Sequence, residues 1–473
     1  MTPRAALLVA LAAIACSEKP PRGASAKAAF TPGCHYEARL VNPEDFTLEV
    51  EARCLKRGIK GFRMIESAAH GHVSDVRDEK GTPLRASGSS FELDGKEPSV
   101  RYRVELGAIA NAEDDFDLAA RFGKSLIAPV STWLLEPNPV RSGGPLTLHV
   151  TSLAGAAFAS ALHQGQPGLF DIEQHELRVA SYSAFGWLRL HELDLTGRHG
   201  QKSRLEIVFL DGPLDLEMDA WLGFVNESVR AVSAFYQGFP VPRATLFVMP
   251  RSGRAGVLFG KVLPESSPGI ALLIGQHTER AMLADDWILV HELYHLGFPS
   301  FQGEGKWLDE GLATYYEPII RTRAGLRSEA SLWEEFVTSM PRGLDALANG
   351  GLENAANFRG IYWGGAIVCL LADVEIRRRS NGAQGLEDGL LALLDAGGHA
   401  SEVWTLKDAI EAVDHAVGAP VLEGLFARHA RRSQSLDLAR LFSDLGVRRS
   451  ARGVVLDDRA PLAAVRRSIV ARR

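Results

Sequence analysis

The stretch that decides the fold of this 473-residue chain reads Leu289-Val290-His291-Glu292-Leu293-Tyr294-His295-Leu296. It contains the pattern H-E-x-x-H. On a helix, positions i and i+4 lie on one face, so His291 and His295 can reach the same metal ion. Glu292 stands beside the first imidazole, where its carboxylate can take a proton from water. The pattern therefore predicts a helix that carries a zinc-dependent hydrolytic site.

The residues around the motif favour a buried helix. From Leu283 to Leu296 the chain has no Gly or Pro, and Gly297 and Pro299 then mark a helix end. Asp285 and Asp286 stand near its start, where the helix dipole favours negative charge. The segment is apolar nearly all round, which is typical of a buried helix. Buried His and Glu side chains are costly unless they are paired or ligated, so a zinc site is favoured over a structural cluster.

A catalytic zinc needs a third protein ligand and one open position. Glu310, fifteen residues after His295, is the candidate, and it lies in the run Trp307-Leu308-Asp309-Glu310-Gly311-Leu312-Ala313. The glycine-rich segment 297–306 can turn the chain so that a second helix brings Glu310 back. Gly311 removes side-chain bulk where the two helices approach. The prediction is one zinc per chain; the alternative reading of Glu310 is a solvated helix carboxylate.

These two segments resemble the gluzincin metallopeptidases, most of all the glycyl-aminopeptidase family, and are related to aminopeptidase N. Fourteen residues separate His295 from Glu310, whereas the aminopeptidase N pattern has eighteen. No β-rich segment for the PDZ domain of glycyl-aminopeptidases is expected after the catalytic part. The resemblance implies peptide-bond hydrolysis by a water activated by zinc and Glu292, which passes the proton to the leaving amine.

Further site residues follow from the same resemblance. The segment Ile361-Tyr362-Trp363-Gly364-Gly365-Ala366 resembles the Y-x-K-G-A segment of these families, with Gly364 in place of Lys. This implies that Tyr362 donates a hydrogen bond to the oxyanion of the transition state; the alternative is a packing tyrosine. Asp309 and Glu317 are candidates to orient a zinc-bound histidine, and Glu317 can equally be read as exposed.

Substrate selection is less defined by the sequence. Aminopeptidase N relatives carry a G-A-M-E-N segment before the zinc helix, whose backbone binds the peptide and whose Glu holds the free amine. The equivalent segment here is Pro268-Gly269-Ile270-Ala271-Leu272-Leu273, which has no Glu. We expect Gly269, Ile270 and Ala271 to offer a strand edge to the peptide. The amine anchor is absent or supplied elsewhere, for instance by Glu265, so exopeptidase and endopeptidase action both stay open.

The pattern of short segments predicts an α+β multidomain protein. Residues 34–210 show alternating strand-like segments and form a predicted β-rich N-terminal domain. Residues 211–325 alternate strands and helices and form the predicted thermolysin-like catalytic domain. Residues 326–473 look almost entirely helical, including a capped helix starting at Thr405.

The first residues indicate export. Residues 1–16 resemble a bacterial lipoprotein signal ending at Cys16, and residues 17–33 read as a flexible tether to the outer membrane. The alternative is an ordinary cleaved signal. Cys34 and Cys54 could pair in an oxidising periplasm, whereas Cys369 is expected to be a buried free thiol. We expect contact with the membrane only through a lipid anchor.

Charge and composition restrict the partners. The formal net charge is −6 with 23% charged residues, so no nucleic-acid partner is expected and a peptide or protein substrate is. Two other readings stay open. One is a non-catalytic envelope binding protein on a peptidase scaffold, and the other is a zinc hydrolase of a non-peptide substrate.

Overall fold

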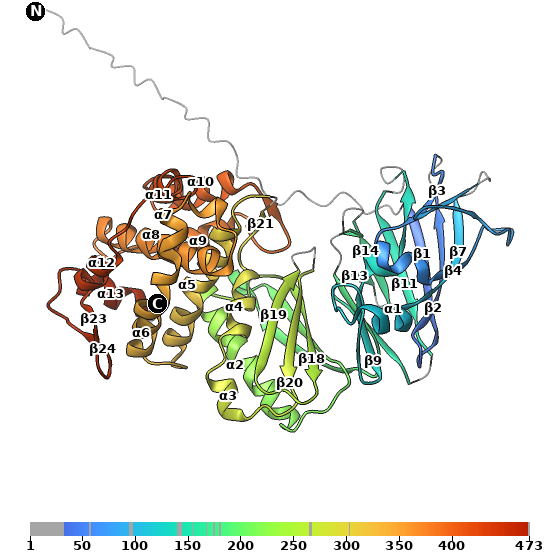
Figure 1. The fold of residues 1–473 in the computed structure, drawn as a ribbon, viewed down its shortest axis with the longest axis horizontal. Coiled ribbons are helices and arrows are strands. Elements are labelled where there is room, and N and C mark those ends of the chain that lie inside the picture. The colour runs from blue at the N-terminus through green and yellow to red at the C-terminus, as the bar shows by residue number, and fades with distance from the viewer. Residues whose placement is uncertain are drawn as a thin grey trace, which may run out of the picture.

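A computed structural model describes residues 33–471, apart from 56–57, 94–97, 140–143, 154, 167, 174–175, 179–180, 264–266 and 302. Figure 1 shows a β-rich N-terminal part, a mixed sheet covered by helices, and a helical C-terminal part. The predicted fold class is therefore confirmed. The predicted signal peptide and nearly all of the predicted tether lie outside the described residues.

The N-terminal part is centred on a seven-stranded sheet in which β1 (Cys34–Asn42) pairs with β2 (Thr47–Cys54) antiparallel and with β11 (Leu146–Thr151) parallel. Buried and exposed residues alternate along β1, as expected for strands with one face in a core. The other strands of this sheet are β4 (Val73–Arg77), β7 (Ser99–Glu105), β13 (His163–Gln166) and β14 (Leu169–Ile172).

Two four-stranded sheets and a short helix complete the N-terminal part. One sheet contains β3 (Gly61–Met64), β5 (Arg85–Ser87), β6 (Ser90–Glu92) and β10 (Leu135–Asn138). The other contains β8 (Ala120–Phe122), β9 (Ser125–Pro129), β12 (Ala157–Ser160) and β15 (Tyr182–Gly186). The helix is α1 (Leu106–Glu113). Residues 176–178 form a turn, and β15 begins at Tyr182.

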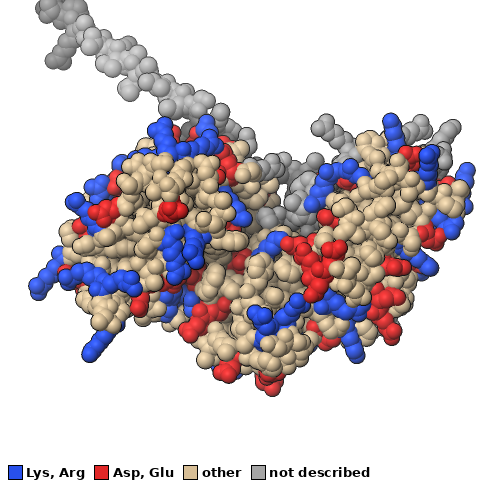
Figure 2. Space-filling model, in the orientation of Figure 1, with Lys and Arg blue, Asp and Glu red and all other residues tan. Residues whose placement is uncertain are grey.

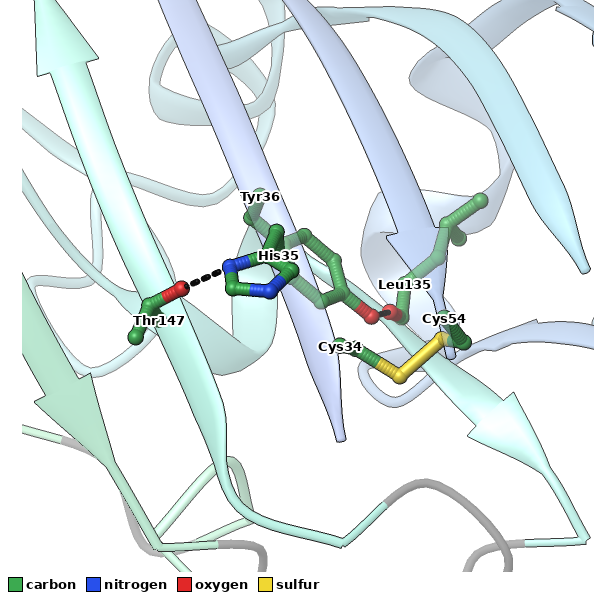
Figure 3. The surroundings of a disulfide bond; sticks show 6 residues. All are labelled: Cys34, His35, Tyr36, Cys54, Leu135 and Thr147. Carbon is green, nitrogen blue, oxygen red and sulfur yellow. Dashed lines mark hydrogen bonds between the residues drawn. A yellow bond between two sulfur atoms is a disulfide. The ribbon is translucent and has the colours of Figure 1, made fainter. Parts of the chain in front are cut away.

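A disulfide joins the first two strands (Figure 3). Cys34 and Cys54 lie directly opposite each other in the antiparallel β1–β2 pair and form the bond. The neighbouring Tyr36 donates a hydrogen bond to the backbone carbonyl of Leu135 at 2.7 Å. The disulfide thus ties β1 to β2, and the Tyr36 phenol ties β1 to β10 of the neighbouring sheet.

The mixed sheet has the strand order β16-β17-β18-β20-β19. Its strands are β16 (Arg189–Thr196), β17 (Lys202–Phe209), β18 (Arg243–Arg251), β19 (Val257–Leu263) and β20 (Gly269–Gly275). β16 pairs with β17, and β17 pairs with β18. The sheet therefore begins at Arg189, before the predicted domain boundary at residue 210. The sequence placed β17 in the N-terminal domain since strand patterns do not reveal their partners.

The two faces of this sheet belong to two different cores. On β17, Leu205 and Ile207 pack in the core that contains the helices, while Val208 packs in a smaller core with strands of the N-terminal part. The same alternation on β18 sends Leu246 to the helices and Phe247 to the N-terminal part. Alternation with a period of two thus makes a single sheet the junction between the N-terminal strands and the helices.

The helices that share a core with one face of this sheet include α2 (Met218–Tyr236), α3 (Arg280–Ala284), α4 (Ile288–His295), α5 (Lys306–Ala324) and α8 (Gly365–Arg379). The single helix predicted for 283–296 is wrong, because the chain breaks between α3 and α4. Asp286 lies at the break and accepts a hydrogen bond from the backbone N–H of Leu289 at 3.1 Å. This carboxylate caps the helix that carries the motif.

The C-terminal part is mostly helical, as predicted. It contains α6 (Glu329–Ser339), α7 (Leu344–Ala348), α9 (Leu386–Asp395), α10 (Leu406–Ala416), α11 (Val421–His429), α12 (Leu438–Asp444) and α13 (Ala463–Val470). Thr405 caps α10 as predicted, and Cys369 is a buried free thiol as predicted. Two small strand pairs were not predicted: β21 (Ser300–Phe301) with β22 (Val403–Trp404), and β23 (Val447–Ser450) with β24 (Gly453–Leu456).

The surface mixes both signs of charge. Figure 2 shows Lys and Arg side chains interspersed with Asp and Glu over the face in view. Several C-terminal arginines have a carboxylate partner; Arg448 pairs with Asp457, and Arg467 pairs with Asp458. In the part of the chain that the structure describes, no helix combines the length and apolar character needed to cross a membrane.

Candidate active site

The three predicted zinc ligands lie together at the junction of α4 and α5. His291 Nε2 lies 3.3 Å from Glu310 Oε2, and His295 Nε2 lies 3.6 Å from the same oxygen. One ligand atom from each of the three residues falls within 4.8 Å of the others, and His291 is buried. Within the described residues, no other cluster of three His, Cys, Asp or Glu side chains meets this criterion.

This arrangement fits a zinc ion. Two ligand atoms bound to zinc at about 2.0–2.1 Å with tetrahedral angles lie about 3.3–3.4 Å apart. The distance from His291 Nε2 to Glu310 Oε2, 3.3 Å, equals this separation, and the distance from His295 Nε2 to the same oxygen, 3.6 Å, is slightly longer. Two imidazoles and one carboxylate are also a donor set that zinc accepts in catalytic sites, with a fourth position left for water. The residues present therefore fit the metal that the motif implies.

Asp309 orients His295. Its carboxylate accepts a hydrogen bond from His295 Nδ1 at 2.8 Å, which turns the other nitrogen of that imidazole toward Glu310. Burial disfavours the charged form of His295, but the neighbouring carboxylates of Asp309 and Glu310 together outweigh this and raise its pKa. His291 Nδ1 is buried and has no hydrogen-bond partner among the described residues.

Glu317 lies elsewhere, contrary to the expectation that it orients a histidine. It is buried and forms an ion pair with Arg321, whose guanidinium Nη1 lies 3.2 Å from its carboxylate. Arg321 also donates a hydrogen bond to the backbone carbonyl of Ala284. Glu317 therefore helps to fix α5 against the end of α3, and the alternative reading of an exposed side chain is wrong as well.

Glu292 lies against the edge strand β19. The backbone N–H of Val262 hydrogen-bonds its carboxylate, and burial raises the pKa of Glu292 to about 7 against the opposing charge of His295. Gly260, two residues earlier on β19, leaves the room that the side chain needs. A Cβ atom at Gly260 would lie 2.5 Å from Glu292 Cγ and 2.6 Å from a methyl group of Ile288.

Tyr362 lies beside the ligands. It belongs to a π-helical turn, Arg359–Gly364, that leads into α8, and its ring stacks on the His291 ring with centroids 5.8 Å apart. Burial, followed by the negative charge of Glu310, raises the pKa of the Tyr362 phenol. The phenol thus stays protonated at neutral pH, as a hydrogen-bond donor must. Single π-turns inside helices are frequent at functional sites.

A glycine contact sets the position of that turn. A Cβ atom at Gly311 of α5 would lie 2.5 Å from the backbone of Gly365 at the start of α8. The sequence assigned Gly311 to the approach of the two zinc-ligand helices, but it permits the approach of α5 to α8 instead. This approach brings the π-turn with Tyr362 next to the helix that carries Glu310.

The strand edge for substrate binding was predicted on the wrong strand. Gly269, Ile270 and Ala271 lie on β20, which pairs with β18 on one side and with β19 on the other. Their backbone groups are therefore occupied within the sheet. The edge strand next to the zinc helix is β19, which ends the strand order. Glu265, the alternative amine anchor, lies outside the described residues.

Three site features escaped the sequence reasoning. Gly260 and the Val262 backbone act through a strand that only the sheet order places beside Glu292. Glu353 accepts hydrogen bonds from the Trp307 indole at 2.7 Å and from the backbone of Gly305 at 3.4 Å, and so fixes the start of α5. No sequence signal points to Glu353, because it lies 43 positions after Glu310, in a single 3-10 turn, Leu352–Asn354, far from the motif in sequence.

The sequence matches no protein-family model, and it matches no curated protein. Solved structures do match. An aminopeptidase N family protein from Idiomarina loihiensis gives a TM-score of 0.66 at 15% identity, over 88% of this chain and 78% of that chain. A variant of the M1 zinc metallopeptidase from Deinococcus radiodurans gives a TM-score of 0.50 at 12% identity, over 85% and 94%.

These likenesses show the fold. The chain has the β-rich N-terminal region, the mixed sheet with helices and the helical C-terminal region of M1 peptidases. The structural neighbours are proteins of the aminopeptidase N group. In this chain, the spacing between His295 and Glu310 is four residues shorter than in the pattern of that group. The resemblance to glycyl-aminopeptidases stays a sequence-based prediction.

Proposed function

We propose that this protein is a zinc-dependent metallopeptidase. The observation that carries the proposal is the convergence of His291 Nε2 and His295 Nε2 on one carboxylate oxygen of Glu310, with Glu292 beside them. His291, His295 and Glu310 would hold one zinc ion. When bound there, zinc supplies Lewis acidity, which makes water acidic enough to react at neutral pH and polarises a carbonyl group.

Three side chains of the protein would transfer the proton, stabilise the oxyanion and orient a zinc ligand. Glu292 takes the proton of the attacking water on its carboxylate and delivers it to the amine that leaves. The Tyr362 phenol donates a hydrogen bond to the oxygen of the scissile carbonyl as negative charge develops on it, which is worth about 3 kcal/mol. Asp309 holds His295 in the orientation that directs its Nε2 to Glu310.

The free edge of β19 supports peptide as the substrate class. A peptide in extended conformation can add to an exposed strand through main-chain hydrogen bonds. Because Val262 of this strand already contacts Glu292, a peptide paired along β19 would pass the proposed base. Aminopeptidase action is the finer form of the proposal, and it requires an anchor for the free amine of the substrate.

The first experiment measures metal and cleavage on the full chain. We expect about one zinc per chain after purification, cleavage of members of a peptide library, and loss of cleavage in Glu292→Gln with zinc retained. A purified protein without zinc that also fails to bind it would refute the proposal. Equal cleavage by Glu292→Gln would refute the assigned base.

The same assay separates the alternatives. Zinc retention without any peptide cleavage would favour a binding protein or a hydrolase of non-peptide substrates. Peptides with a free or an acetylated amino terminus distinguish the two modes of cleavage. Loss of cleavage on acetylation indicates an aminopeptidase, and indifference to acetylation indicates an endopeptidase.

We also propose that the protein is exported and lipid-anchored through Cys16. The apolar run before Cys16 and the disulfide between Cys34 and Cys54 support this, because structural disulfides persist in oxidising compartments. We expect labelling of the chain with a palmitate analogue in bacterial cells and loss of the label in Cys16→Ser. A chain that stays unlabelled and fractionates with the cytosol would contradict the proposal.

A further inference from the structure

Two large aromatic side chains next to the site are exposed to solvent. Trp287, the residue that precedes α4, is 48% exposed, and Phe358, the residue that precedes the π-turn, is 72% exposed. Scattered single apolar residues are normal on a protein surface. These two differ because each one contacts a residue of the proposed active site.

The contacts run through ring pairs. Trp287 stands one helical turn before His291, and the two rings meet edge to face with centroids 5.5 Å apart. Phe358 stands four residues before Tyr362, and those rings lie 5.7 Å apart. Since the Tyr362 ring stacks on His291, the four rings form one continuous series. Its middle pair is the proposed zinc ligand His291 with the proposed oxyanion donor Tyr362, and its two end rings are exposed to solvent.

This arrangement leaves exposed apolar surface next to two residues of the proposed site, His291 and Tyr362. A substrate residue bound beside the scissile bond is positioned to cover one of these rings. Aromatic rings prefer edge-to-face or offset partners, so an aromatic or large aliphatic side chain gains the most from that contact. Small or charged side chains would leave the ring wet or lose their own hydration.

We infer that Trp287 and Phe358 select peptides with a large apolar residue next to the scissile bond. The inference rests on the proposed peptidase function and adds the substrate class to it. Trp287 and Phe358 contact the substrate side chain, whereas the proton transfers belong to Glu292 and the oxyanion contact belongs to Tyr362.

The test compares two peptides that differ in one residue, Phe or Ala, beside the bond that is cut. We expect the natural chain to cleave the Phe peptide with a kcat/KM about 10-fold or more higher, as for a well-filled apolar pocket. Trp287→Ala and Phe358→Ala should lower this ratio toward one, and Trp287→Phe should restore most of it. The ratio cancels any general loss of catalysis that a variant causes.

The control is Trp187→Ala. Trp187 is similarly exposed, at 43%, but follows β15 on the N-terminal part and contacts Lys124 rather than the site. This variant should keep the Phe-to-Ala ratio of the natural chain. An equal preference for both peptides in the natural chain, or an unchanged ratio in both Trp287→Ala and Phe358→Ala, would overturn the inference.

A binding measurement separates this inference from the proposed function. The Kd values of the same two peptides are measured by calorimetry with Glu292→Gln, alone and combined with Phe358→Ala or Trp287→Ala. Tighter binding of the Phe peptide that depends on the two rings supports the selection even if the natural chain cleaves no peptide. Cleavage by the natural chain without any ring-dependent binding or cleavage preference refutes the selection and leaves the proposed function intact.

Discussion

Adding one methyl group at Gly260 tests whether the position of Glu292 matters as much as its chemistry. The new Cβ would lie 2.5 Å from Glu292 Cγ and 2.8 Å from its Oε1, whereas ordinary contacts begin at 3.4 Å. The Glu292 side chain must therefore shift by roughly 1 Å, and a misplacement of this size can cost about 100-fold in rate. We expect Gly260→Ala to lower kcat on peptides about 100-fold.

The metal content and the fold should change little. The three atoms nearest to the added Cβ belong to Glu292 and Ile288 rather than to a zinc-ligand histidine, so about one zinc per chain should remain. Crowding a packed site costs about 1–3 kcal/mol, which is measured as a fall in the free energy of unfolding. Gly223→Ala is the matched control, because an added Cβ there meets nothing within 4 Å. A kcat for Gly260→Ala within twofold of the control would refute the reasoning.

Three further variants test the parts around the site. Asp309→Asn should weaken zinc binding about 10- to 100-fold in a competition with a chelator, and unchanged affinity would show that it does not orient His295. Arg377→Met should lower the free energy of unfolding in urea by about 3–5 kcal/mol, because it leaves the buried Asp373 carboxylate, now 2.9 Å from Arg377 Nε, without its cation; a loss under 1 kcal/mol would contradict a buried pair. Removing the disulfide, which closes a loop with a sequence separation of 20, should cost about 3 kcal/mol and leave the zinc content unchanged. Loss of zinc in that variant would contradict the separation of the N-terminal core, which contains Cys34 and Cys54, from the core that contains the site helices.

The sequence predicted the site where local spacing alone determines the geometry. His291 and His295 fall on one helix face because any helix of 3.6 residues per turn places them there. The loop of Gly303 and Gly305, both with positive φ, returns the chain so that Glu310 meets them. The fold class was readable for the same reason, since strand and helix periods differ.

The sequence failed where partners come from distant strands. The peptide edge was assigned to β20 because segment 268–273 stands where aminopeptidase N relatives carry G-A-M-E-N, but pairing with β18 and β19 occupies both sides of this strand. The mixed sheet likewise begins before the predicted boundary at residue 210, since β17 reads as a strand whichever sheet it joins. Strand order depends on long-range pairing that a period of two does not encode.

The choice between Asp309 and Glu317 shows how helix geometry limits such reasoning. Glu317 follows Glu310 by seven residues, so the two carboxylates share a helix face, but they lie about 10 Å apart along the axis. His295 already directs Nε2 to Glu310, so its Nδ1 can reach only a carboxylate close to that residue. Asp309, one position earlier and about a quarter turn around the helix, satisfies this condition at 2.8 Å. A shared face is therefore sufficient for two ligands of one metal only when the axial distance is one turn, and an orienting carboxylate is better sought beside the ligand than two turns beyond it.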